Sequence, residues 1–275
     1  MEYIAGIVLY NPNIPRLREN VNSIINQVNY LVLVDNGSEN INEVKEIYQA
    51  EEKIIFVENN KNLGISKALN IIVEIALLKG YKWALLLDQD SVCPSKMVSK
   101  YNEYIMEDKV AIICPKIVDR NDKVMDKSDM LNTTEYVNEA ITSGSLVNCK
   151  ICEMLGFFNE TMFIDYIDLD YSKRVIENKY KILKINEVEL LHEIGMKKEY
   201  NILGLKVSTY NHSAFRKYYI TRNTIYFSKK YDDESIVLAY LKILKRTVLV
   251  LLLENNKYAK IRAIIKGIKD SYKMS

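Results

Sequence analysis

A short apolar run that ends in two acids, WALLLDQDS at residues 83–91, constrains the fold more than any other part of this 275-residue chain. Five successive apolar residues are typical of a strand buried on both faces inside a parallel sheet. Ligands of such sheets bind just beyond the carboxyl ends of the strands, so Asp88 and Asp90 are expected at a binding site. Two carboxylates this close repel each other unless they share a cation or a proton. We interpret them as ligands of Mg²⁺ or Mn²⁺; a solvated strand end without a metal is the alternative.

Three earlier strands also end in polar residues. The patterns predict strands at 3–9, 30–34 and 53–57 and helices at 14–28, 41–48 and 65–78. Strands and helices that alternate with short connections predict right-handed βαβ units and a mostly parallel sheet. The side chains expected along one rim of this sheet are Tyr10, Asn11, Asp35, Asn36, Asp88, Gln89 and Asp90. Neither GxGxxG nor a Walker motif occurs, which disfavours the corresponding nucleotide folds.

The second half of the chain is less regular. We predict a helix at 95–106, a strand at 110–114, a loop at 119–132 and one or two strands within 180–191. A second acidic cluster opens a helix that extends to about residue 178, and its members are Asp165, Asp168 and Asp170. The helix dipole favours acids in a first turn, so these residues are either functional carboxylates or caps.

The charge of the chain is unevenly placed. The formal net charge is +2, but residues 242–275 contain nine Lys/Arg and two Asp/Glu, a local charge of +7. Apolar residues recur at helical spacing in this part, at Leu241, Leu244, Val248 and Leu252 and again at Ile261, Ile264, Ile265 and Ile268. A basic amphipathic helix is typical of a segment that lies on an anionic membrane surface. A helical hairpin packed on the catalytic domain is the other interpretation.

The remaining composition indicates a cytoplasmic protein. The cysteines at positions 93, 114, 149 and 152 do not combine with the two histidines into a zinc-finger pattern and are interpreted as reduced, packed thiols. The N-terminus lacks the basic region of a signal peptide, and no apolar stretch approaches the ~20 residues that span a bilayer. Together with the basic segment, this predicts a location at the inner face of the cell membrane.

Seven segments, taken in order, resemble family 2 inverting glycosyltransferases with the GT-A fold, specifically the rhamnosyltransferase-like branch. They lie within residues 3–225 and read VLYN (8–11), VDNGS (34–38), NNKNLG (59–64), LDQDS (87–91), GS (144–145), FIDYIDLDY (163–171) and LHxxG (191–195). The resemblance implies an α/β GT-A catalytic domain at 1–228, with a nucleotide-sugar half at about 1–118 and an acceptor half at 119–228. A basic amphipathic helical segment at 229–275 would follow it.

The resemblance also implies a donor site. Asp35 matches the position that contacts the pyrimidine base, and Asp88 and Asp90 match the DxD acids near the ribose and metal. The residues assigned to the nucleotide-sugar are Tyr10, Asn11, Asp35, Asn36, Asn62, Gly64, Asp88, Gln89, Arg216 and Arg222. The residues assigned to a Mg²⁺ or Mn²⁺ ion are Asp88, Asp90 and His192. Arg216, Arg222 and His212 lie in a stretch similar to the family's RxYYxxRN and are expected to neutralise a diphosphate, or else to belong to a solvated helix face.

The catalytic base is assigned in the same way. Asp168 matches the base of the family's EDxD segment, although Ile167 stands where that pattern has Glu. Asp165 is the second candidate. The residues assigned to the acceptor are Gly144, Ser145, Tyr166 and Asp170.

The implied function is transfer of a sugar with inversion, most simply L-rhamnose from dTDP-L-rhamnose, onto a glycan or lipid-linked saccharide in the synthesis of a bacterial cell-surface polysaccharide. A homodimer is one expected state, and no nucleic acid is expected as a partner. The alternatives are a UDP-sugar-dependent transferase of the same fold, a haloacid-dehalogenase-like phosphatase suggested by the DQDSV sequence, and a nucleotide-sugar-binding protein without catalysis.

Overall fold

The computed structural model describes residues 3–120, 132–193, 198–202, 205–232 and 234–274. Within them the chain forms two compact units, one of residues 1–160 and 168–193 and the other of residues 161–167 and 194–275. Most of the predicted loop at 119–132 and Gly195 of the LHxxG segment lie outside the described residues.

An eight-stranded sheet forms the centre of the first unit. Its strand order is β3-β2-β1-β4-β7-β5-β8-β6. The strands are β1 (Ile4–Leu9), β2 (Tyr30–Asp35), β3 (Ile54–Glu58), β4 (Trp83–Asp88), β5 (Val110–Asp119), β6 (Thr134–Val137), β7 (Leu146–Asn148) and β8 (Lys181–His192). The first four strands pair in parallel, as predicted. β7 and β6 are antiparallel to their neighbours, whereas β5 and β8 are parallel.

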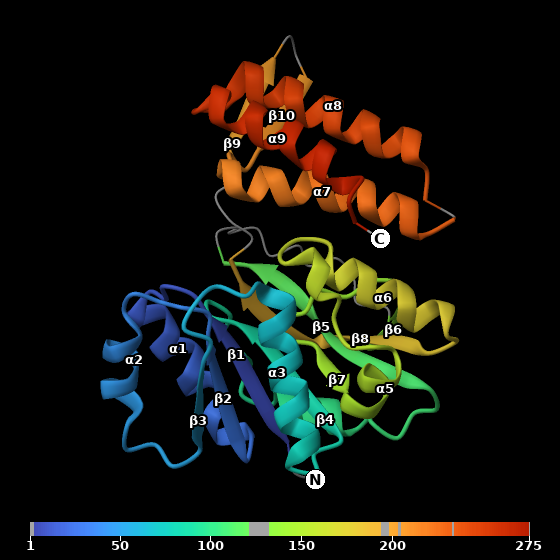
Figure 1. The fold of residues 1–275 in the computed structure, drawn as a ribbon. Helices are drawn as coiled ribbons and strands as arrows, with labels where there is room; N and C mark the ends of the chain where they lie inside the picture. Colours follow the sequence, from blue (N-terminus) through green and yellow to red (C-terminus); the bar gives the residue numbers. More distant parts are fainter. Residues whose placement is uncertain (1–2, 121–131, 194–197, 203–204, 233, 275) are drawn as a thin grey trace. The chain divides into compact units, whose positions relative to one another are not determined.

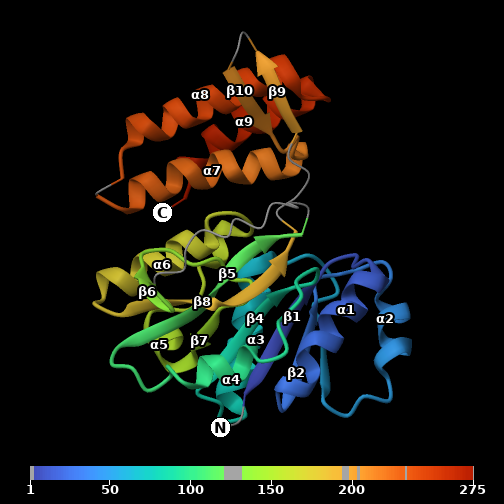
Figure 2. The same ribbon diagram turned by 180° about the vertical axis from the view of Figure 1, so that it is seen from behind.

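Helices cover both faces of this sheet. They are α1 (Ile14–Ile24), a 3₁₀ turn at Ile25–Gln27, α2 (Ile41–Tyr48), α3 (Ile65–Leu78), α4 (Met97–Asn102), α5 (Cys149–Met154) and α6 (Ile167–Glu177). α3 and α5 lie on one face, and α1 and α4 lie on the other (Figures 1 and 2). α3 approaches the sheet closely because Gly6 has no side chain; a Cβ there would overlap Ile72.

The first helix shows how the sequence determines these elements. Asn13 caps α1 by accepting a hydrogen bond from the Arg16 backbone N–H at 3.2 Å. A proline in the first turn fits because the first N–H groups of a helix have no partner within the helix. Leu17, Val21 and Ile24 then bury one face against the sheet.

The second unit contains a β-hairpin and three helices. These are β9 (Lys198–Ile202), β10 (Leu205–Thr209), α7 (Ala214–Lys230), α8 (Ile236–Leu253) and α9 (Lys257–Ser271). A small apolar core joins the helices through Ile225, Ile243, Val250 and Ile264. α9 packs closely on α7 at Gly267, which has no side chain. A Cβ at this position would lie only 2.7 Å from the Tyr218 carbonyl oxygen. α7 packs with α8 and α9 and belongs to this unit, whereas the sequence-based prediction places most residues of α7 in the catalytic domain.

Candidate metal and donor site

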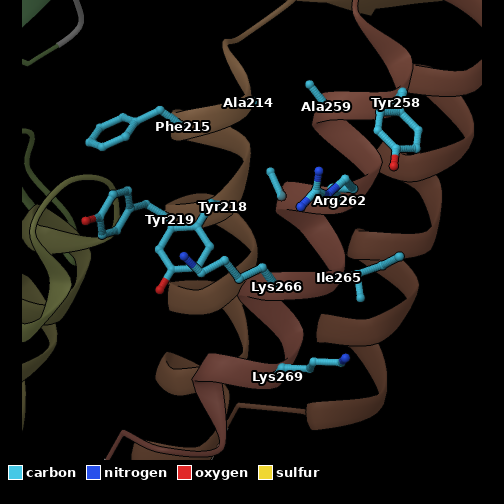
Figure 3. Close-up of a pocket in the computed structure, with 11 residues that line it drawn as sticks. Ala214, Phe215, Tyr218, Tyr219, Tyr258, Ala259, Arg262, Ile265, Lys266 and Lys269 are labelled. Atoms are coloured by element: carbon cyan, nitrogen blue, oxygen red, sulfur yellow. The ribbon is translucent and has the colours of Figure 1, made fainter.

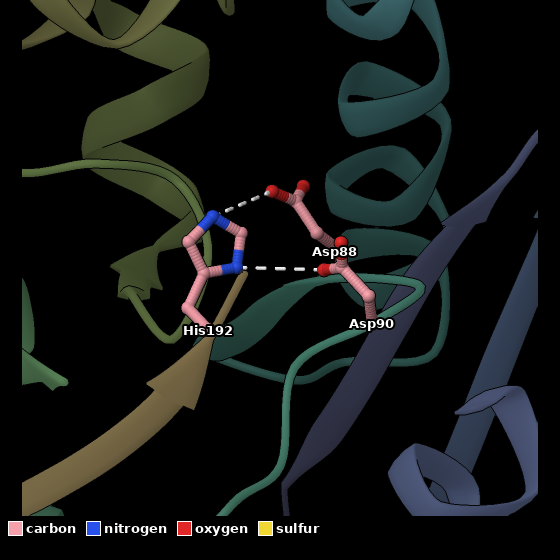
Figure 4. A group of neighbouring side chains, drawn as sticks. All are labelled: Asp88, Asp90 and His192. Carbon is pink, nitrogen blue, oxygen red and sulfur yellow. Dashed lines mark ion pairs between the residues drawn. The ribbon is translucent and has the colours of Figure 1, made fainter. Parts of the chain in front are cut away.

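Two carboxylates and one imidazole from distant parts of the chain meet at one end of the sheet (Figure 4). Asp88 is the last residue of β4, Asp90 follows two positions later, and His192 is the last residue of β8. His192 Nε2 lies 3.8 Å from Asp88 Oδ2, and His192 Nδ1 lies 3.4 Å from Asp90 Oδ1. One possible ligand atom from each residue lies within 4.8 Å of the others. The predicted trio is therefore brought together.

The electrostatics of this cluster favour a cation. Asp90 Oδ1 is buried, and among the described residues its polar neighbour is His192 Nδ1 at 3.4 Å, which is too long for a good hydrogen bond. This is a costly state for a carboxylate oxygen. Burial by itself lowers the pKa of His192, but the Asp90 and Asp88 carboxylates outweigh it and raise that pKa above its ordinary value. Two carboxylates and one imidazole suit a divalent ion such as Mn²⁺, which accepts both oxygen and nitrogen ligands.

A buried chain of hydroxyl groups supports the three candidate ligands. Ser91 Oγ lies 3.1 Å from His192 Nδ1 and 2.7 Å from Ser143 Oγ. Ser143 Oγ also accepts a hydrogen bond from the Asp88 backbone N–H at 3.1 Å. On the other side, Asn20 of α1 donates from Nδ2 to the Asp88 carbonyl at 2.5 Å. Sequence reasoning missed Ser143 and Asn20, because a single polar residue carries no spacing signal.

The strand ends predicted to hold the nucleotide form one hydrogen-bonded rim. Asp88 pairs with Val8 in the sheet, and Leu9 pairs with Asp35. Gln89 accepts from the Tyr10 N–H at 2.9 Å, and Ser38 Oγ accepts from the Asn11 N–H at 2.8 Å. The Tyr10 side chain is about half exposed and is free to contact a ligand.

The loops after β2 and β3 are joined in the same way. Asp35 is buried, and its carboxylate accepts from the backbone N–H groups of Gly37 and Ser38. Asn36 donates to the Gly64 carbonyl at 3.0 Å, and Gly64 donates its N–H to Asn62 Oδ1 at 3.0 Å. Gly64 has a φ of +89°, which only glycine adopts readily. Asp35, Asn36, Asn62 and Gly64 thus share one loop cluster, and their contact with a nucleotide stays a prediction.

The second acidic cluster separates into three different environments. Asp168 lies in the first turn of α6, where its Oδ1 accepts from the Leu169 N–H at 2.9 Å. Asp165 belongs to the second unit and pairs with both Nε and Nη2 of Arg216 at 3.2 and 2.9 Å. Asp170 has a fully buried side chain paired with Arg174 at 2.9 Å. Asp168 occupies the position that the family pattern assigns to the base, and its role stays a prediction.

Three residues assigned to the acceptor make contacts within the first unit, and their role at an acceptor stays a prediction. Asp170 is held in a buried ion pair with Arg174. Gly144 accepts at its carbonyl from the Tyr101 hydroxyl at 2.8 Å, and the buried Ser145 hydroxyl donates to the Ile141 carbonyl at 2.5 Å. These two residues hold the turn before β7. The fourth, Tyr166, lies in the second unit, where its hydroxyl bonds with Thr224 Oγ1 at 3.0 Å.

The predicted diphosphate cations also have partners within the second unit. Arg216 is paired with Asp165. Arg222 donates to the carbonyl groups of Thr161 and Met162 and lies over the ring of Tyr219, 4.7 Å from its centroid. Burial, and then the nearby Arg216 charge, lower the pKa of His212 to about 4, so this side chain is neutral at physiological pH. Their role at the donor stays a prediction.

Comparisons with known proteins identify the class. The model of the family "Glycosyl transferase family 2" matches residues 5–165, more than half of the chain. The protein therefore belongs to glycosyltransferase family 2 and is a glycosyltransferase. This family assignment removes the phosphatase alternative.

Individual relatives agree with this class. The chain is similar to the dTDP-rhamnosyl transferase RfbF of Shigella flexneri, with 28% identity over 286 residues that cover 96% of this chain and 95% of the relative. Its fold is similar to that of a mannosyltransferase from Pyrobaculum calidifontis in complex with GDP-Man and Mn²⁺ (TM-score 0.60, 16% identity, covering 100% of this chain and 76% of that one). It is also similar to S. aureus TarS 1-349 in complex with UDP-GlcNAc (TM-score 0.58, 14% identity, 100% and 74%). The GT-A fold is thereby confirmed.

Proposed function

We propose that this protein transfers L-rhamnose from dTDP-L-rhamnose to a saccharide acceptor with inversion at the anomeric carbon. The observation that carries the proposal is the meeting of Asp88, Asp90 and His192 at the carboxyl end of the sheet, beside the loops predicted to hold the nucleotide. The rhamnosyl donor is supported by the similarity to RfbF over nearly the whole of both chains. A UDP-sugar is the second candidate donor, because a neighbour in fold was solved with UDP-GlcNAc.

We assign the divalent ion to Asp88, Asp90 and His192, with Mn²⁺ preferred to Mg²⁺ because imidazole is a poor ligand for Mg²⁺. Such an ion, when bound, neutralises the charge that develops on the diphosphate leaving group. The chain's own contribution is to fix the ligands: Asn20 and Ser143 hold the Asp88 backbone, and Ser91 contacts the His192 ring.

Asp168 is assigned as the general base. In a single displacement, its carboxylate takes the proton of an acceptor hydroxyl while the acceptor oxygen forms a bond to C1 of the sugar. The bond from C1 to the phosphate oxygen breaks on the opposite side, and the nucleoside diphosphate leaves. Attack on one face and departure from the other invert C1. Asp168 is chosen over Asp165 because it matches the base position of the family pattern and lies in the first turn of α6.

We also propose that the reaction takes place at the inner face of a cell membrane, on a saccharide acceptor that is lipid-linked. Light scattering measures whether the protein is the predicted homodimer. The support for the membrane location is the basic helical segment at 229–275, in which α8 and α9 together carry most of the positive charge. Among the described helices, none combines the length and the apolar character needed to cross a bilayer.

Thermal unfolding with nucleotides tests the donor site first. The protein is melted with Mn²⁺ and, in turn, dTDP, UDP and GDP, as wild type and as Asp90→Ala. A nucleotide at 100 times its dissociation constant adds about 2.7 kcal/mol, a shift of a few degrees for a chain of this length. We expect a metal-dependent shift with dTDP that Asp90→Ala abolishes and that the exposed control Asp108→Ala keeps.

The transfer assay then uses dTDP-L-rhamnose, with the anomeric configuration of the product read by NMR. A larger shift with UDP would move the donor to a UDP-sugar, and no shift with any nucleotide would overturn the proposal.

A further inference from the structure

The outer face of α8 is apolar and uncovered. Eight of its apolar side chains are between 37% and 64% exposed, namely Ile236, Val237, Leu238, Leu241, Leu244, Val248, Leu251 and Leu252. The opposite face of the helix supplies Ala239, Ile243 and Val250 to the interior of the unit. A helix that is apolar on both sides is normally covered on both, so the outer row points to an external partner.

The charges around this row are all of one sign. Residues 236–253 contain no Asp or Glu. Lys242 and Lys245 are exposed on α8 and form no ion pair with any described residue. Arg246 is different, because it donates to Thr224 Oγ1 at 3.0 Å within the unit. The uncovered face therefore combines apolar side chains with unpaired ammonium groups.

A basic groove lies on the neighbouring helix. Arg262, Lys266 and Lys269 of α9 line a cavity of about 740 Å³ together with Tyr218 and Tyr219 of α7. Lys266 lies beside Tyr218, whereas Lys269 points away from both tyrosines (Figure 3). Lys266 lies 5.3 Å from the centroid of the Tyr218 ring. None of the three cations forms an ion pair with a described acid, whereas Lys217 and Lys260 of the same helices are buried against Glu254. These three charges are thus available to an external anion.

The net charge also differs in sign between the two units. Residues 161–167 and 194–275 contain seventeen Lys/Arg and seven Asp/Glu, a net charge of +10. Since the whole chain carries +2, the first unit carries −8. A second copy of the same basic face would be repelled, whereas an anionic lipid surface would be attracted.

We propose that α8 lies in the headgroup region of an anionic bilayer, parallel to its surface, while the unpaired cations of α8 and α9 bind lipid phosphates. The helix is about 27 Å long, but Lys242, Lys245 and Arg246 at its middle keep it from crossing the bilayer. The inference deepens the proposed membrane location by assigning the apolar contact to α8 and the phosphate contacts to α9. It does not depend on which sugar is transferred.

The test is vesicle flotation of the full chain, with phosphatidylcholine alone and with phosphatidylcholine containing phosphatidylglycerol. No sugar nucleotide is added. We expect binding only to the anionic vesicles, weakened by salt. The triple variant Leu241→Gln, Leu244→Gln, Val248→Gln should lower vesicle affinity at least ~100-fold. Its matched control, Leu78→Gln with Met106→Gln, changes exposed apolar residues of the first unit and should keep full binding.

The charge contribution is tested with Arg262→Gln and Lys266→Gln against the exposed control pair Lys96→Gln and Lys150→Gln. The first pair should lower binding to anionic vesicles by about tenfold, and the control pair should leave it unchanged. Equal binding to neutral vesicles would overturn the charge assignment.

A second copy of the chain, rather than a membrane, as the partner of α8 would be detected in the absence of lipid. If light scattering finds a dimer that the triple variant dissociates, α8 contacts a second copy and the proposal is overturned. Failure of the proposed transferase function would appear separately, as loss of the dTDP-dependent thermal shift, which the triple variant should retain. Flotation that fails while this shift persists would overturn the membrane inference alone.

Discussion

At the scale of single residues, the orientation of His192 depends on two serine hydroxyls. Ser91 Oγ lies 3.1 Å from Nδ1 of the ring, and we infer that Nε2 is the nitrogen that binds a metal. Ser143 holds Ser91 and the Asp88 backbone together. Both hydroxyls are buried, so water does not replace them without cost. They position two of the three candidate ligands.

We expect Ser91→Ala and Ser143→Ala each to weaken Mn²⁺ binding about 10- to 100-fold, because the ring and the Asp88 carboxylate lose their fixed directions. Isothermal titration with Mn²⁺ measures this directly. The exposed neighbour Ser95 is the control, and Ser95→Ala should bind as the wild type does. An unchanged affinity in both buried-site variants, with only a lower free energy of unfolding, would show that the serines are packing residues.

A second prediction at this scale concerns Asp168, the proposed general base. Asp168→Asn keeps the shape of the side chain but removes its capacity to take a proton, so kcat should fall by about 10²- to 10⁴-fold. The dTDP-dependent thermal shift should remain, since Asp168 is not among the candidate metal ligands. Asp165→Asn should retain more activity. If the Asp165 variant proved the more damaged in kcat, the two roles would be exchanged.

At the scale of elements, the join between β10, α7, α8 and α9 is polar and buried. Glu254, just after α8, pairs with Lys217 at 2.6 Å and Lys260 at 2.8 Å and accepts from Thr209 Oγ1 at 2.5 Å. Burial alone would raise the pKa of Glu254, but hydrogen bonds from the two lysines and Thr209 lower it. His212 lies beside this join with a pKa lowered to about 4, first by burial and then by the Arg216 charge.

The pKa of His212 makes acid sensitivity a testable property. The unfolded chain takes up the proton at about pH 6.5 and the folded chain at about 4. The contribution of His212 is therefore fully present above pH 6.5 and is lost as the pH falls toward 4. Between pH 7.5 and 5 these two pKa values correspond to about 2 kcal/mol, and solvent screening at this partly exposed side chain lowers the effect to about 1 kcal/mol. The free energy of unfolding should therefore fall by about that much more in the wild type than in His212→Asn. Urea unfolding at both pH values measures this, and an equal fall in the two proteins would contradict it.

The elements that the sequence predicted are those with a long, periodic pattern. The parallel strands at 4–9, 30–35, 54–58 and 83–88 and the helices between them follow from apolar runs and helical spacing. β6 and β7 were not predicted, because they have four and three residues and no period can be read from so few. The hairpin of β9 and β10 was also not predicted, because its strands, KEYNI and LKVST, contain no apolar run. The predicted helix at 95–106 is shorter, at Met97–Asn102.

Some residues of the candidate site could also be predicted from the sequence, and others could not. Asp88, Asp90 and His192 could be predicted because strand ends and a family pattern marked them. The internal ion pair of Asp170 could not, because it depends on Arg174 one helical turn later in a helix that buries that face. The partners of Arg216 and Arg222 depend on the tertiary contacts of one short segment, residues 161–165. Sequence shows which groups are available but not which of them neutralise each other.

At the scale of the whole molecule, chemistry and charge are divided between the two units. The first unit holds the three candidate metal ligands and a net charge of −8, and the second holds the basic helices and +10. A carboxylate site needs a cation, and a basic helical unit needs an anion, so each unit selects a partner of opposite sign. We expect 1 M salt to release the chain from anionic vesicles while Mn²⁺ binding, which is short-range and partly buried, changes little. Flotation and titration at two salt concentrations check this.

The strand order of the sheet has a consequence for biosynthesis. His192 joins Asp90 across a hundred intervening residues, and β7 and β5 must be in place between β4 and β8 before the two meet. Contacts so distant in sequence form late in folding. A growing polypeptide therefore has no complete metal site until β8 has left the ribosome and added itself to the sheet. Binding of a metal ion by these three residues would thus report that the first unit is complete.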